Sequence, residues 1–417
     1  MSSIARSARA HVFGLDGLRA VAAFAVVAHH VGFDTGTIFR GPLGIVWEQL
    51  DIGVAVFFVL SGFLLGGPFI RRLLDDRPID GIGRFWVRRA VRIYPAYWVV
   101  LTVMVLFLGT SIASFREGVL LYGLLQIYDA DTFFSGMVQA WTLCVEISFY
   151  AVLPLMALLG SLLLRRLRVV RRERVLVLAC ALLYLGSTVW RLSMYLLPPT
   201  IGRLGMSWLP GQFDLFALGL ALAVLRAWAE RDDALAARIE RTVRWPGVWF
   251  AAAGAVFAFS CLVKLRRPVV PVDSPFLFGD GREFARQIAF GAVAALLLAP
   301  LALRRAPVKG SARVLGLRPM VVLGVLSYGV YLWHKSLIPK VQEWLGLAPF
   351  DGGFVPVLLL VSLGATVLAW VTYRVVEHPT LALVKGGSLR VRLTDRSGAT
   401  TGQDADQDPG QPPLGSS

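Results

Sequence analysis

The sequence predicts an all-α fold, a polytopic membrane bundle of about ten transmembrane helices. Two observations carry this prediction. Of the 417 residues, 56% are hydrophobic and only 17% are charged, and the mean hydropathy is +0.65, which is more apolar than a soluble core requires. Apolar segments close to the ~20 residues that cross a bilayer also recur along the chain.

The apolar segments follow one another with short polar links. They cover residues 13–33, 50–70, 95–112, 141–164, 175–196, 209–229, 247–264, 284–303, 319–342 and 354–376. A further apolar stretch, Gly118–Tyr128, is about half as long as a spanning helix, so we expect a re-entrant or interfacial segment there.

Three regions are expected along the chain. Residues 1–12 form an N-terminal segment, residues 13–380 the transmembrane domain and residues 381–417 a tail. From about Asp395 the tail is rich in Gly, Asp, Gln, Pro and Ser, which bury too little apolar surface to offset the entropy of ordering. We therefore expect the tail to be largely disordered.

The net charge of +15 is distributed in short basic runs between apolar segments. These runs are Arg71–Arg92, Arg165–Arg174, Arg226–Arg244, Arg304–Arg318 and the tail. Such a pattern is typical of cytoplasmic loops and argues against nucleic acid as a partner. We expect a multi-pass protein of the cell (inner) membrane, embedded in the lipid bilayer with both termini in the cytoplasm.

Cys144, Cys180 and Cys261 are widely spaced in apolar sequence, so we expect packing roles and neither disulfides nor a metal site.

The first segment carries polar residues that are costly in a membrane: Asp16, Arg19, His29 and His30. At 100° per residue, Arg19 and His30 differ by only about 20° around a helix and lie roughly 16 Å apart along it. Asp16 shares their stripe, whereas His29 points about 80° away. Alternatively, Asp16 and Arg19 only pair at the cytoplasmic rim while the histidines lie at the outer interface.

Polar groups after the second segment suggest an anion site. Arg89 and Arg92 are three residues apart, on one face of a helix that starts on the cytoplasmic side. Guanidinium groups in that arrangement suit phosphate. The alternative is topology signalling or contact with lipid headgroups. Ser61 and the glycines before it suit close helix contact.

Later segments add further candidates. Glu146 lies inside an apolar span with Tyr150 one turn further on, and either it is functional or it pairs with an arginine elsewhere. Asp214 carries the same two interpretations. Tyr331 and His334 share one helix face with Ser327, yet with Trp333 they could instead form an interfacial aromatic belt.

In order and combination, these residues resemble the bacterial acyltransferase type 3 membrane proteins over roughly residues 13–380. The matching strings are Leu15-Asp16-Gly17-Leu18-Arg19 with His30, Phe57-Phe58-Val59-Leu60-Ser61-Gly62-Phe63, Arg89-Ala90-Val91-Arg92-Ile93-Tyr94-Pro95, Trp141-Thr142-Leu143-Cys144-Val145-Glu146 with Phe149-Tyr150, Ser327-Tyr328 with Tyr331-Leu332-Trp333-His334, and Tyr373-Arg374 with Glu377 and Pro379.

The resemblance implies transfer of an acyl group, commonly acetyl, from a cytoplasmic coenzyme A thioester to a hydroxyl on a sugar, glycan or secondary metabolite. It links Arg19 and His30 to catalysis, and Arg89 and Arg92 to function.

The sequence departs from the usual family pattern at three places. Ile147 replaces a second carboxylate, Lys335 and Ser336 replace an aromatic residue and a proline, and Gln212 replaces an arginine. These departures concern the acceptor more than the reaction. The sequence shows no appended esterase-like domain, so transfer to a final acceptor is expected within the membrane unit or through another protein.

The resulting hypothesis assigns three sets of residues. His30, Arg19 and Glu146 are catalytic, with His30 acting as general base or forming an acyl-histidine. Arg89, Arg92 and Ser61 bind the donor. The acceptor is bound or supported by Asp16, Asp214, Tyr150, Tyr331 and His334. Acyl-CoA is a co-substrate and no cofactor is permanently bound.

Two other classes of protein remain open at this point. A transporter or flippase would use the same buried groups to bind a polar glycan or metabolite without chemistry. A structural subunit of an envelope-glycan assembly complex would tolerate substitutions at Arg19 and His30.

Overall fold

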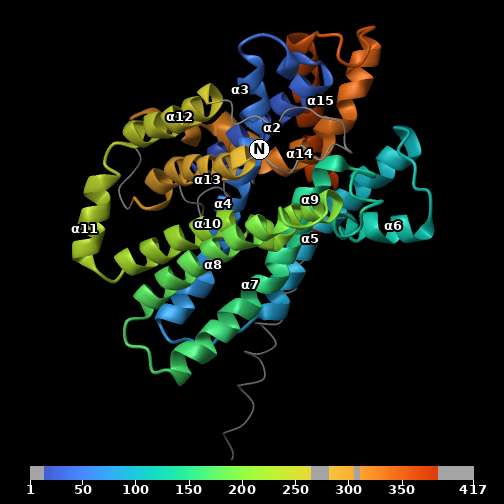
Figure 1. Ribbon diagram of the computed structural model, residues 1–417. Helices are drawn as coiled ribbons and strands as arrows, with labels where there is room; N and C mark the ends of the chain where they lie inside the picture. Colours follow the sequence, from blue (N-terminus) through green and yellow to red (C-terminus); the bar gives the residue numbers. More distant parts are fainter. Residues whose placement is uncertain (1–13, 264–280, 305–309, 384–417) are drawn as a thin grey trace, which may run out of the picture.

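The computed structural model describes residues 14–263, 281–304 and 310–383, and the regular structure within them is entirely helical (Figure 1). The predicted N-terminal segment 1–12 and the predicted disorder of the tail lie outside these residues.

Ten helices match the ten predicted apolar segments. They are α2 (Leu15–Asp34), α4 (Ile52–Leu74), α5 (Ile82–Phe107), α7 (Trp141–Arg166), α8 (Arg172–Met194), α10 (Leu209–Ala229), α12 (Pro246–Leu262), α13 (Gly281–Ala302), α14 (Arg318–Trp344) and α15 (Phe354–Thr372). Short helices lie between them: α3 (Gly44–Glu48), α6 (Phe115–Tyr122), α9 (Pro199–Ser207) and α11 (Asp233–Thr242).

The predicted polytopic membrane bundle is confirmed. Within the described ranges, eight helices are long and apolar enough to cross a membrane, and α11 with α12 makes a ninth if this pair, bent by 62°, is one span. Helix α2 is 20 residues long but carries the ionisable side chains that lower its hydropathy. The third long helix begins at Ile82 instead of near residue 95, so Arg89 and Arg92 lie in its first turns.

The stretch Gly118–Tyr128 is too short to span a membrane, as predicted. It contains the end of α6 and a 3₁₀ turn, η4 (Gln126–Tyr128), and it packs against α5. The hydroxyl of Tyr97 donates to the carbonyl of Leu121 at 2.7 Å, and the indole of Trp98 donates to the carbonyl of Tyr122 at 2.9 Å. Figure 1 shows α6 at the edge of the bundle, beyond α5.

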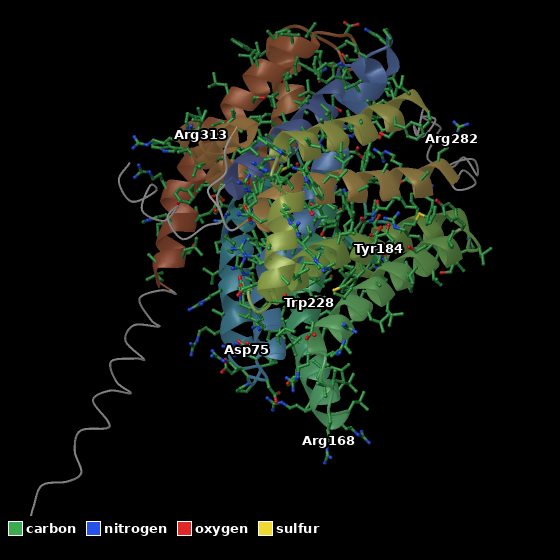
Figure 2. The ribbon with its side chains drawn as sticks, turned by 90° about the vertical axis from the view of Figure 1, so that its left-hand side faces the viewer. Asp75, Arg168, Tyr184, Trp228, Arg282 and Arg313 are labelled. Atoms are coloured by element: carbon green, nitrogen blue, oxygen red, sulfur yellow. The ribbon has the colours of Figure 1, made fainter. Side chains whose placement is uncertain are left out.

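Three of the predicted basic links are joined by ion pairs. Asp76, between α4 and α5, accepts from Arg165 at 2.8 Å and from Arg172 at 2.9 Å, which joins both ends of the α7–α8 link. These bonds lower the pKa of Asp76, and a bond from Arg231 likewise lowers the pKa of Asp75. Figure 2 shows Asp75 and Arg168 toward the same end of the molecule. Three basic links therefore lie on one side of the bundle.

Glycines bring α2 into backbone contact with its neighbours. A Cβ on Gly324 of α14 would lie 1.9 Å from the carbonyl oxygen of Asp16, and one on Gly53 of α4 would lie 2.2 Å from that of Ala22. Gly62 packs in the same way against Phe216 of α10. Small residues allow such close approach between membrane helices, so α2 is enclosed by α4 and α14. The three cysteines are free and buried, as expected.

We expect Gly324→Val to force α2 and α14 apart, because every valine rotamer places a Cβ onto the Asp16 carbonyl. Overpacking of this kind costs about 1–3 kcal/mol or more. The thermal unfolding midpoint in detergent should therefore fall. Gly186→Val on α8 is the matched control, since a Cβ there meets no atom within 4 Å. Equal midpoints for the two variants would contradict the close α2–α14 contact.

Candidate functional site

Two histidines from opposite ends of the sequence are hydrogen-bonded at the centre of the site. Nδ1 of His30 on α2 lies 3.0 Å from Nε2 of His334 on α14. His334 is fully buried, and its Nδ1 lies 3.2 Å from the carbonyl of Val330. His29 points elsewhere, with its Nδ1 2.7 Å from the carbonyl of Glu48. His30, the histidine that the helical stripe aligns with Arg19, is thus the one that contacts His334.

The hydrogen bonds determine which ring nitrogens carry protons. A carbonyl only accepts, so Nδ1 of His334 is protonated and its Nε2 accepts when the ring is neutral. The neighbouring Nδ1 of His30 must then donate. This leaves the lone pair of His30 Nε2 outside the bond between the two histidines. The pair is therefore arranged so that His30 can accept a proton while His334 stabilises the resulting imidazolium.

Glu146 of α7 is held by two hydroxyl groups. Ser61 of α4 donates to Oε1 at 3.0 Å, and Tyr150 donates to Oε2 at 3.0 Å. Among the described residues Glu146 forms no ion pair, although Arg19 and Arg89 are close enough to interact with it electrostatically. Ser61 was predicted to bind the donor. In the structure its hydroxyl is instead hydrogen-bonded to Glu146 and orients that carboxylate.

Two guanidinium groups, those of Arg19 and Arg89, interact with this carboxylate, and that of Arg92 lies next to them. Arg19 interacts electrostatically with Arg92, Tyr150 and Glu146, and Arg89 interacts with the same three groups. Arg19 also pairs with Asp16, at 3.8 Å. Nε of Arg89 is buried without a hydrogen-bond partner, and the described residues offer Arg89 no ion pair. An incompletely neutralised group of cations within an apolar bundle is suited to bind an anion.

Glu377 holds Arg92 in this cluster, although the sequence analysis assigned no role to this carboxylate. Nη1 of Arg92 donates to Oε2 of Glu377 at 2.8 Å, and the Glu377 side chain is only 3% exposed. Glu377 lies in a π-helical turn, η8 (Tyr373–Glu377), which follows α15. Such turns are often found at functional sites. The sequence did offer one signal for Glu377, because an ionisable residue directly after an apolar span is often functional.

A cavity lies beside the arginines and the histidines. It is lined by Val54, Phe57 and Phe58 from α4, Thr142, Leu143 and Glu146 from α7, and Ser327, Tyr328 and Tyr331 from α14. Glu146 faces it from the arginine side. Tyr331 is another wall residue, and its ring lies 5.6 Å from that of His334.

The residues on α14 are interior residues. Tyr331 and Trp333 are each 6% exposed, and the hydroxyl of Tyr331 bonds to Thr142 at 2.8 Å and to the carbonyl of Gln139 at 3.0 Å. The alternative of an interfacial aromatic belt is therefore wrong, because such residues would have to reach the bundle surface.

Asp214 is held in a different place from the other candidates. It accepts from Gln287 of α13 at 3.0 Å and interacts electrostatically with Arg191 of α8. Its hydrogen bonds thus link α10 to α13, and none of them reaches Glu146 or the histidine pair. No three His, Cys, Asp or Glu side chains gather as metal ligands within the part of the chain that the structure describes.

The hydrogen bonds predict one tautomer for both histidines, with the proton on Nδ1. Nitrogen-15 NMR of histidine-labelled protein should show this pattern near neutral pH, and His334→Asn should shift the His30 signal while leaving His29 unchanged. The signals are assigned by replacing each of the five histidines in turn. A His30 ring protonated on Nε2 alone would contradict the arrangement.

Comparison with known proteins gives one family. A family profile described as an acyltransferase domain matches residues 12–374.

Three curated relatives are similar to this chain. A peptidoglycan O-acetyltransferase of Listeria monocytogenes is 26% identical over 354 residues, 81% of this chain and 51% of the relative. A putative peptidoglycan O-acetyltransferase of Bacillus subtilis is 27% identical over 391 residues, 88% of this chain and 55% of the relative. An O-acetyltransferase of Staphylococcus aureus is 24% identical over 383 residues, which are 88% of this chain and 56% of the relative. The chain thus spans about half the length of these relatives, and no solved structure matches it.

Proposed function

The chain belongs to the acyltransferase domain family, and from that premise we propose that it is a membrane O-acetyltransferase that moves acetyl from acetyl-CoA to a hydroxyl of an envelope glycan. The relatives named as peptidoglycan O-acetyltransferases suggest the glycan as the acceptor class. The observation that carries the proposal is a cavity with two wall residues that adjoin the charged groups: Glu146 neighbours Arg19 and Arg89, and Tyr331 neighbours the bonded pair of His334 and His30.

The donor would bind through its phosphates at the arginine cluster. Arg89 has a partnerless Nε, and Arg92 keeps further N–H groups after its bond to Glu377. Guanidinium groups form strong, directional bonds to phosphate. Binding this remote part of the donor supplies free energy that holds the thioester in place. The basic links on the same side of the bundle support a cytoplasmic donor site, with both chain termini in the cytoplasm and the protein in the cell membrane.

His30 would act as the general base. Its Nε2 takes the proton from the acceptor hydroxyl as the hydroxyl oxygen attacks the thioester carbonyl carbon. The new C–O bond forms, the C–S bond breaks, and the coenzyme A thiolate leaves and takes up a proton. His334 accepts a hydrogen bond from Nδ1 of His30 throughout, which favours the charged ring. Glu146, fixed by Ser61 and Tyr150, adjoins the cavity that would hold the acyl group.

Purified protein in nanodiscs should release free thiol from acetyl-CoA only when a glycan acceptor is present. His30→Ala should lower this rate about 10²–10⁴-fold, the usual contribution of a general base. His29→Ala is the matched control and should keep the wild-type rate, because His29 bonds to the Glu48 carbonyl and not to His334. Acceptor flux across the membrane without thiol release would identify a transporter instead.

Arg89→Gln should raise the KM for acetyl-CoA about tenfold or more while changing kcat less, since a bond to a charged group contributes about 1.5–3 kcal/mol. Arg88→Gln, an exposed arginine one residue earlier, should leave the KM unchanged. If both variants behave as wild type, the arginines serve topology or lipid contact and do not bind the donor.

A further inference from the structure

We infer that the cavity beside Glu146 is an acyl-binding pocket whose size restricts the donor to acetyl, and that Phe57 sets this limit. The inference rests on the proposed function and adds the selection of the acyl chain.

The position of the cavity fits the reacting end of the donor. One wall carries Glu146, whose electrostatic neighbours are Arg19 and Arg89. Another wall carries Tyr331, which adjoins His334 and, through it, His30. A thioester whose phosphates lie among the arginines and whose carbonyl is attacked near His30 must place its acyl group between these walls.

The cavity has the size of a short acyl group. Its volume is about 60 Å³. That space accommodates the three heavy atoms of an acetyl group together with the thioester sulfur. Protein interiors are close-packed, so a longer chain would have to displace side chains from the wall. One extra methylene in such a pocket typically changes kcat/KM by about 10–200-fold, which in this cavity would favour acetyl.

Phe57 is the wall residue best placed to set the length. Val54, Phe57 and Ser61 lie on one face of α4, and Val54 and Phe57 form an apolar part of the wall of the cavity that Glu146 and Tyr331 also line. Among the described residues the Phe57 ring has one aromatic neighbour, Tyr331, at 6.3 Å and edge to face. Its removal would therefore extend the cavity without breaking an aromatic stack.

The adjacent Phe58 has a structural role instead. Its ring stacks on Phe216 at 4.8 Å, and Phe216 stacks on Phe149 at 4.1 Å, which joins α4, α10 and α7. Phe58 is 1% exposed and Phe216 is fully buried. Shortening Phe58 would disturb the helix packing, so Phe57 is the informative position.

The test measures acceptor-dependent thiol release with acetyl-, propionyl- and butyryl-CoA. The wild type should lose about 10–200-fold in rate for each added methylene. Phe57→Ala should raise the butyryl-to-acetyl rate ratio at least about tenfold. Phe63→Ala is the matched control, because it removes a buried ring from the same helix outside the cavity and should leave the ratio unchanged. Phe57→Leu, a smaller truncation, should raise the propionyl-to-acetyl ratio if the alanine variant does not fold.

Two outcomes would overturn the inference. One is a wild type that uses butyryl-CoA as readily as acetyl-CoA. The other is a folded Phe57 variant, with the wild-type unfolding midpoint, that keeps the wild-type rate ratios. In both cases the proposed acyl transfer would stand, because thiol release from acetyl-CoA by the wild type tests it separately.

Discussion

Three guanidinium groups, those of Arg19, Arg89 and Arg92, lie together inside an apolar helix bundle, and the site is arranged around the free-energy cost of holding them there. Neighbouring like charges raise this cost. Asp16 offsets part of it at 3.8 Å from Arg19, and Glu377 offsets more at 2.8 Å from Arg92. Arg89 receives no such partner among the described side chains. A polyanionic substrate would complete the compensation, so the same electrostatic deficit that destabilises the empty site favours occupancy by a ligand.

Close helix contact brings this charge cluster and the histidine pair near one cavity, whose wall residues Glu146 and Tyr331 adjoin them. Gly324 and Gly53 let the backbones of α14 and α4 approach α2. With the axes this close, side chains three and four residues apart on each helix face one shared space. Glu146 and Tyr150 form such a stripe on α7, as do Tyr331 and His334 on α14. Small residues without chemistry of their own therefore decide where the chemical groups meet.

The departures from the usual family pattern each have a local structural counterpart. Lys335, beside His334, binds both carboxylate oxygens of Asp34 at 2.7 Å and so ties α14 to the end of α2. Ile147 adds no second carboxylate, and the two oxygens of Glu146 are instead bound by Ser61 and Tyr150. Near Asp214 the neighbouring cation is Arg191 from α8, whereas Gln212 bonds to the Met206 carbonyl. These contacts rigidify helix ends and adjust the surroundings of the site without altering the histidine pair.

The sequence by itself determined the membrane class, the ten apolar helices and the polar stripe of α2, because apolar length and the 3.6-residue period are local properties of the backbone. For the same reason it placed His30, and not His29, on the stripe of Arg19. Only the tertiary structure decided which side chains the site residues contact. His334 is 304 positions from His30, and Ser61 is 85 positions from Glu146, so their contacts depend on helix rotation and crossing. Glu377 lies in a π turn, where the period changes, and regular spacing therefore could not place it against Arg92.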